Sequence, residues 1–145
     1  MATFVKFNQF VYDLARKVHK LETAANTGDA LVIALTTTSP NAATHAVRAD
    51  LSAIEIAYTN LSTRACVVSA SGQSGGVYTL KITDLVLTAS GAVATFRYVV
   101  LYNDTPTSPA DPLIGYWDYG ANVTLANLET FTIDFDDTLG VLTLT

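Results

Sequence analysis

Residues 96–120 read FRYVVLYNDTPTSPADPLIGYWDYG, and this stretch decides the fold. Its first part is almost entirely apolar and aromatic, which is typical of a strand that is covered on both faces. A loop rich in Pro, Ser, Thr and Asp follows, and the chain then returns in a second aromatic segment. Because consecutive strands usually lie side by side, the sequence predicts a central strand at residues 92–102 that pairs with residues 113–119.

Segments with apolar residues at alternate positions surround this pair and predict further strands. They lie at residues 30–36, 65–69, 78–83, 84–88, 130–136 and 142–144. Residues 71–76, SGQSGG, are predicted to be a flexible turn, and residues 136–140 a hairpin turn between the last two strands. Asp50 is predicted to cap a single helical turn, with Leu51 and Ile54 facing inward.

A helical period runs through residues 4–21. Apolar residues recur there at spacings of three and four: Phe4, Phe7, Val11, Leu14, Val18 and Leu21. Asp13, Arg16 and the lysines lie off this stripe, and His19 lies among the lysines, as on a solvated face. The stripe is expected to pack on a sheet of the same chain or, alternatively, to dock on another subunit.

Length and pattern together predict one domain, because 145 residues can build a core without disulfides or metals. The N-terminal helix is assigned to residues 1–25 and the strands to residues 29–145. The predicted fold class is mainly β: a β-sandwich or jelly-roll-like double sheet with an N-terminal amphipathic α-helix.

Charged residues make up only 14% of the chain, where roughly 25% is usual for soluble domains. Either partners cover part of the surface, or exposed strand positions carry Ser and Thr, and the two explanations are compatible. The net charge of −5 without a basic stripe argues against nucleic-acid binding. No apolar run is long enough to cross a bilayer, and the first residues lack a signal-peptide pattern. We therefore expect synthesis in a cytoplasm, with neither a nucleic-acid nor a membrane partner.

The best metal candidates are three acidic residues near the C-terminus, Asp134, Asp136 and Asp137. They lack the glycine-punctuated loop and the bidentate Glu of a calcium site, so solvated strand and turn positions are favoured. His45 has no acid or thiol nearby in the sequence, and no Ser occupies a G-x-S-x-G motif. The single cysteine, Cys66, has apolar neighbours and is predicted to be a buried, inert thiol. The sequence thus predicts no catalytic residue, no metal and no cofactor.

Asp104, Asp111 and Asp118 surround the aromatic segment. They can line a carbohydrate groove, although turn formation is the plainer explanation for Asp104 and Asp111. Residues 103–112 hold three prolines and are predicted to be extended, stiff and exposed. Such a segment suits a contact arm, and an ordinary hairpin loop is the alternative.

Aromatic residues are favoured anchors of protein interfaces, and the second aromatic segment is expected to expose at least one of them. Trp117 itself is expected in the core. The candidate interface residues are Phe4, Phe7, Val11, Asn103, Pro106, Pro109, Pro112, Tyr116, Trp117 and Tyr119.

Taken together, several motifs resemble a family of small virion structural proteins from tailed bacteriophages. They are F-x-x-F-x-x-x-V with a V-H pair at residues 4–19, T-x-S-P within residues 36–40, A-D-L-x-x-I at residues 49–54, F-R-Y-x-V-L-Y-N-D at residues 96–104 and L-I-G-x-W-D-Y-G at residues 113–120. The resemblance covers nearly the whole chain and is densest over residues 96–145.

This resemblance implies a non-enzymatic structural protein of the virion, made in the cytoplasm of a bacterial host. A capsid decoration (cement) protein is the form that we expect, present in many copies as a homo-oligomer such as a trimer. Its implied partners are the major capsid protein or other virion proteins. A tail, neck or baseplate component is the alternative within the family, and a carbohydrate-binding or receptor-binding module is an alternative of another class.

Overall fold

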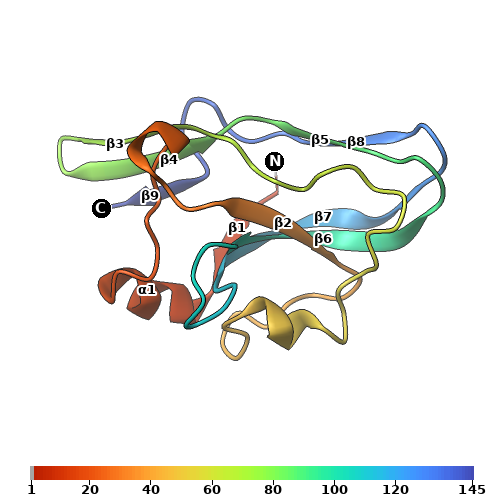
Figure 1. Ribbon diagram of the computed structural model, residues 1–145, viewed down its shortest axis with the longest axis horizontal. Helices are drawn as coiled ribbons and strands as arrows, with labels where there is room; N and C mark the ends of the chain where they lie inside the picture. The colour runs from red at the N-terminus through yellow and green to blue at the C-terminus, as the bar shows by residue number, and fades with distance from the viewer. Residues whose placement is uncertain (1) are drawn as a thin grey trace.

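The computed structural model describes residues 2–145 and shows a mainly β protein with several antiparallel sheets (Figure 1). The largest sheet has the strand order β1 (Phe4–Lys6), β7 (Leu113–Leu125), β6 (Val93–Asn103) and β2 (Leu31–Thr36). A three-stranded sheet has the order β3 (Val68–Ser74), β4 (Val77–Ile82) and β9 (Leu142–Leu144), and β5 (Leu85–Thr88) pairs with β8 (Thr130–Ile133). The helical elements are α1 (Asn8–Ala15), η1 (Ala24–Asn26) and η2 (Arg48–Leu51).

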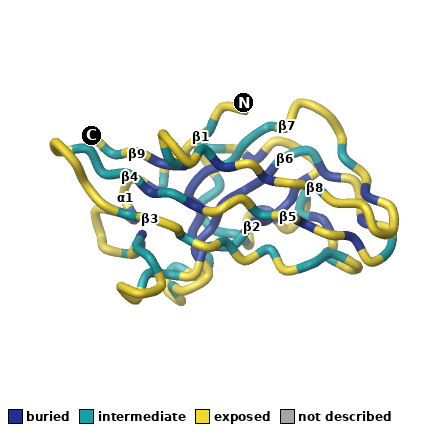
Figure 2. The backbone as a smooth tube through the Cα atoms, turned by 90° about the horizontal axis from the view of Figure 1, so that it is seen from above, coloured by how far each residue is buried: buried dark blue, intermediate teal, exposed yellow. Residues whose placement is uncertain are grey.

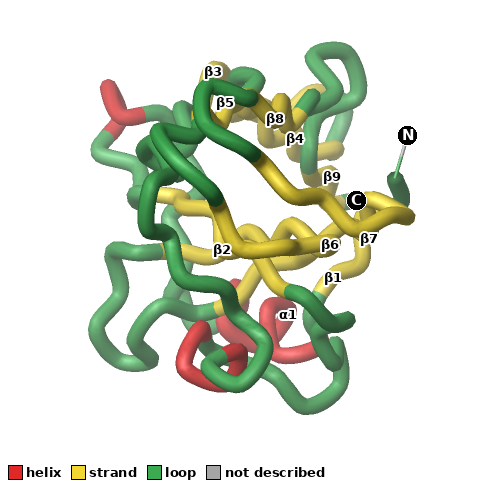
Figure 3. Tube along the Cα trace, turned by 90° about the vertical axis from the view of Figure 1, so that its right-hand side faces the viewer, coloured by secondary structure: helices red, strands yellow, loops and turns green. Residues whose placement is uncertain are grey.

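The strands are arranged in two layers. Figure 3 shows the four-stranded sheet in the middle, the two smaller sheets on one side of it, and α1 on the other side. Buried stretches gather along the middle of the strands, and exposed residues concentrate in the loops (Figure 2). The largest fully buried side chains come from both layers and from α1, and include Phe10, Ile33, Leu80, Ile82, Phe96 and Tyr102.

The predicted central pair is confirmed. β6 pairs with β7 through Val100 opposite Tyr116, and on its other side it pairs with β2 through Val100 opposite Ala34. All residues from Val99 to Asn103 are buried, as expected for a strand that is covered on both faces. This pair forms the buried centre of the protein, and β7 contributes side chains to the surface described below.

The predicted helix over residues 4–21 is wrong at both ends. Residues 4–6 form β1, and the helix ends at Ala15 because Lys17 adopts a left-handed backbone with φ 63°. Its amide donates to the carbonyl of Leu14, a pattern that closes helices. The spacing of Phe4 and Phe7 fitted a helix, but the two residues lie on either side of the strand-to-helix junction.

The buried face of α1 also differs from the predicted stripe. Phe10 and Asp13 are the buried residues of the helix, whereas Val11 is 50% exposed. His19, predicted on a solvated face, is buried against the ring of Phe10 at a centroid distance of 5.1 Å. Asp13 and His19 are therefore part of the interior, and Val11 lies on the outside.

Two turn predictions also need correction. Residues 71–74 belong to β3, and the turn is confined to Gly75 and Gly76, which have φ values of 59° and 84°. The chain does turn at residues 136–140, where the Gly140 amide donates to the Asp136 carbonyl. However, this turn joins β8 of one sheet to β9 of another, so it is not a hairpin.

The short helical turn near residue 50 is confirmed as η2, with Leu51 buried and Ile54 partly buried. The Asp50 carboxylate accepts hydrogen bonds from the amides of Ala46 and Val47 at 2.8 and 3.1 Å. Asp50 therefore caps the start of this turn, although it lies inside the turn and not before it. Among residues 2–145, none of the helices is long and apolar enough to span a membrane.

Candidate interaction surface

An aromatic groove with a volume of about 590 Å³ lies where the two layers of strands meet beside β1. Three of its side chains, Phe4, Trp117 and Tyr119, were predicted as interface residues. The remaining lining residues are Ala2, Val99, Phe131, Thr132, Ile133, Asp134, Phe135, Asp136, Leu139, Gly140 and Val141. We call this surface the aromatic groove.

The inner wall of the aromatic groove is built by the pairing of β1 with β7. Phe4 lies opposite Trp117 in the register, and their ring centroids are 4.9 Å apart. Trp117 also contacts Phe135 edge to face at 5.8 Å. Trp117 is consequently half-buried between two rings, where a core position was expected. Tilted and edge-to-face contacts of this kind favour a fixed ring position.

The outer wall joins the two layers. Tyr119 of β7 meets Phe131 of β8 edge to face at 5.1 Å, and Phe131 in turn contacts Phe96 at 5.2 Å. Tyr119 remains 56% exposed, and Leu139 on the following turn is 70% exposed. Large apolar side chains are therefore presented to solvent next to a preformed aromatic surface, which is typical of a contact site.

Acidic groups form the polar side of the groove. Asp134 is exposed, and the Asp136 carboxylate accepts from the amides of Thr138 and Leu139 at 2.8 and 2.6 Å. Within the part of the chain that the structure describes, neither Lys nor Arg lines the groove. The aromatic groove thus combines apolar contact area with negative charge.

The other predicted interface residues lie elsewhere. Phe7 is fully buried and its ring packs against half-buried Tyr116 at 5.5 Å, so both have structural positions. Val11 lies on the outer face of α1. The sequence located the β7 wall of the groove, but gave no signal that Phe131 or Leu139 would face it.

Residues 103–112 do not form the extended arm: the loop folds back on itself and joins the antiparallel strands β6 and β7, which agrees with the alternative of an ordinary hairpin loop. Thr107 and Ala110 form a β-bridge around a cis Ser108–Pro109 bond. Pro112 is buried and forms a bridge with Val47, and only part of the loop is exposed. Its prolines serve a compact, anchored loop.

Asn103 anchors the start of this loop from the interior. Its side-chain amide donates to Asp29 at 2.7 Å and lies 3.1 Å from His19 Nδ1. Two neighbouring buried atoms, His19 Nε2 and Asp13 Oδ2, have no hydrogen-bond partner among residues 2–145. Burial lowers the pKa of His19, although the charges of Asp13 and Asp29 oppose this shift.

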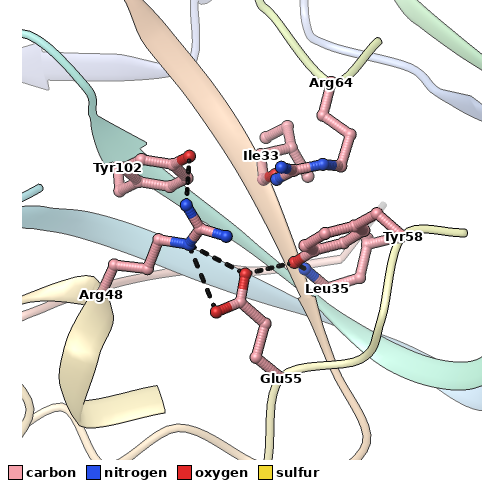
Figure 4. A network of polar contacts seen from close by, with 7 residues as sticks. All are labelled: Ile33, Leu35, Arg48, Glu55, Tyr58, Arg64 and Tyr102. Atoms are coloured by element: carbon pink, nitrogen blue, oxygen red, sulfur yellow. Dashed lines mark hydrogen bonds and ion pairs between the residues drawn. The ribbon is translucent and has the colours of Figure 1, made fainter. Parts of the chain in front are cut away.

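A second polar network attaches residues 48–64 to the central strands (Figure 4). The Arg48 guanidinium donates to Glu55 at 2.9 Å and to the Tyr102 hydroxyl at 3.2 Å. The Tyr58 hydroxyl donates to Glu55 at 2.5 Å and accepts from the Leu35 amide at 2.9 Å. Desolvation by burial, with the Glu55 hydrogen bond, raises the pKa of Tyr58. Sequence reasoning did not single out these residues.

Arg64 completes this network. Its guanidinium stacks on the Tyr58 ring at 3.5 Å and donates to the Ile33 carbonyl. A polar depression of about 440 Å³ lies beside it, lined by Arg48, Arg64, Tyr102 and Asp104 among others. Because Tyr58 bonds the Leu35 amide and Arg64 bonds the Ile33 carbonyl, the network holds residues 48–64 against β2, and we call it the clamp.

Asp104, Asp111 and Asp118, the candidates for a carbohydrate groove, do not come together at the aromatic residues. Asp104 lines the polar depression, and Asp118 forms a two-pronged ion pair with Arg97 at 2.7 and 2.8 Å. Asp111 anchors the folded loop through its carbonyl, which accepts from the Arg48 amide. The acidic groups that do lie in the aromatic groove are Asp134 and Asp136.

Residues 2–145 contain no group of three His, Cys, Asp or Glu side chains placed to hold a metal ion. Cys66 is partly buried, and burial raises the pKa of its thiol to about 12. No family model, curated protein or solved structure matches this chain.

Proposed function

We propose that this protein is a structural component of a tailed-bacteriophage virion, and specifically a capsid decoration protein that stabilises the head. The observation that carries the proposal is the aromatic groove, in which exposed Tyr119 and Leu139 adjoin Trp117. A protein whose task is attachment has to keep such apolar contact area on its surface. The resemblance of the sequence to small virion structural proteins of tailed bacteriophages indicates that the assembly is a phage particle.

The architecture supports this role. We infer that the two layers of strands form a β-sandwich, in which short edge strands and loops surround a firmly paired centre. The pairing of β1 with β7 and the contacts of Trp117 with Phe4 and Phe135 hold the aromatic groove in one shape. A preorganised surface loses little conformational entropy when it binds, which suits repeated attachment to a lattice.

The test is attachment to purified particles. The full-length protein, labelled and mixed with expanded heads that lack it, should sediment with the heads in a fixed ratio to the major capsid protein. Heads carrying the protein should also resist heating better than bare heads. Sedimentation with tails alone would instead assign it to the tail, and sedimentation with neither would reject the virion role.

A carbohydrate-binding or receptor-binding module is the second candidate, because the groove places Trp117 and Tyr119 beside the carboxylates of Asp134 and Asp136. Aromatic rings next to hydrogen-bond acceptors suit sugar rings. This candidate predicts a glycan-array signal that Tyr119→Ala abolishes. Val67→Ala is the control, since Val67 is 65% exposed but lies outside the groove.

A further inference from the structure

The charges of this chain are segregated along the sequence. Of its eight basic residues, four lie between positions 6 and 20: Lys6, Arg16, Lys17 and Lys20. Residues 98–145 contain no Lys or Arg, but hold seven acidic residues: Asp104, Asp111, Asp118, Glu129, Asp134, Asp136 and Asp137. Two of these, Asp134 and Asp136, line the aromatic groove, so a basic partner fits it. Lys81 of β4 donates to the Asp137 carbonyl at 2.6 Å, and Lys81 itself does not line the groove.

The outer face of α1 has the matching chemistry. Val11, Tyr12, Ala15 and Arg16 follow one another at helical spacing and are all exposed, with Tyr12 at 59%. The Arg16 guanidinium lies 4.9 Å from the centroid of the Tyr12 ring and 3.7 Å from the buried Asp13 carboxylate, and Lys17 follows directly. We call these five residues the basic helix face.

The basic helix face cannot reach the aromatic groove of its own chain. Phe7 fixes the start of α1, because its side chain is fully buried and its amide donates to the Ile114 carbonyl at 3.1 Å. Figure 3 shows α1 on the side of the four-stranded sheet opposite to β8, whose residues line the groove. The two surfaces can therefore meet only between different molecules.

We propose that the basic helix face of one copy docks in the aromatic groove of a second copy. Val11 and Tyr12 contact the aromatic wall, and Lys17 faces the carboxylates around Asp134. The contact joins two different surfaces, so it is head-to-tail and builds either a closed ring or an open chain of copies. This inference goes beyond the virion role and does not depend on it, because it concerns the purified protein alone.

The first test measures self-association of the full chain by sedimentation velocity over a range of concentrations. The wild type should form species larger than a monomer as the concentration rises, and added salt should weaken them, since the charges lie at the surface. Val11→Glu should weaken association at least tenfold. Val67→Glu is the matched control: Val67 is also exposed, at 65%, but lies outside both surfaces, and its variant should associate like the wild type.

The second test exchanges the charges. Lys17→Glu and Asp134→Lys should each weaken association about threefold to tenfold, and the double variant carrying both should regain most of it. Recovery separates a direct contact from a folding defect. A wild type that stays monomeric at all concentrations overturns the proposal. Equal weakening by Val11→Glu and Val67→Glu, or no recovery in the double variant, also overturns it.

Discussion

Gly115 of β7 leaves the space that the Phe4 ring occupies. A Cβ atom at position 115 would lie 2.1 Å from the Phe4 ring and 2.9 Å from the Val5 carbonyl oxygen. Contacts this short are not tolerated, so the pairing of β1 with β7 and the inner wall of the aromatic groove depend on this glycine.

Gly115→Ala should therefore displace β1. We expect the free energy of unfolding to fall by about 1–3 kcal/mol, the usual cost of overpacking a fitted site. Urea denaturation measures it. Gly72→Ala is the control, because nothing lies within 4 Å of the Cβ that it would add. Equal stability of the two variants would contradict this account of Gly115.

Tyr58→Phe should destabilise the clamp. The substitution removes the acceptor of the buried Leu35 amide and the donor to Glu55. Leaving such groups unpaired costs about 1–3 kcal/mol. Thermal unfolding should show a clearly lower midpoint than for Tyr12→Phe, which changes an exposed hydroxyl. A midpoint no lower than that of Tyr12→Phe would mean that the clamp contributes nothing to stability.

The pH dependence of stability should contain a contribution from His19. Because burial lowers its pKa in the folded state, the unfolded chain binds a proton more readily than the folded one. Stability from this group is thus fully present above the unfolded pKa of about 6.5 and is lost as pH falls below it. As the pH is lowered from roughly 8 to 5, the urea midpoint of the wild type should fall more steeply than that of His19→Gln. Parallel curves would exclude His19 as the source.

Cys66 should be unreactive in the native protein. Since burial raises its pKa to about 12, almost no thiolate exists near neutral pH. A colorimetric thiol reagent should react with it slowly in buffer and quickly in denaturant. Rapid, complete labelling of the folded protein would show that residues around Cys66 open more readily than the structure indicates.

The sequence predicted the parts of the fold that rest on local pattern. The long apolar runs of residues 92–102 and 113–119, joined by one loop, predict the adjacent strands β6 and β7. The helix was overextended, since a spacing of three between Phe4 and Phe7 is also compatible with a strand that leads into a helix. Backbone conformation at Lys17, which ends α1, has no signal in an apolar period.

Of the aromatic groove, the sequence predicts mainly the residues that lie on the single strand β7. The aromatic segment on β7 predicts interface candidates at Trp117 and Tyr119, although Trp117, expected in the core, is half-buried. Phe131 and Leu139 joined them through the pairing of β8 with β5 and the turn that follows, which are tertiary relationships. The hydrogen bonds that join Arg48, Glu55 and Tyr58 likewise form where these side chains meet over β2, and their spacing in the sequence does not predict them.

The pairing of Phe4 with Trp117 has a consequence for how quickly the protein forms. β1 can pair with β7 only after a loop of more than a hundred residues has closed. The pairing of β4 with β9, which joins Tyr78 to Leu144, also requires a long loop to close. Sheets made from such distant partners acquire their native state slowly, on the order of milliseconds to seconds. We therefore expect the hairpin of β6 and β7 to form first, and the wall that Phe4 gives to the aromatic groove to be among the last parts completed.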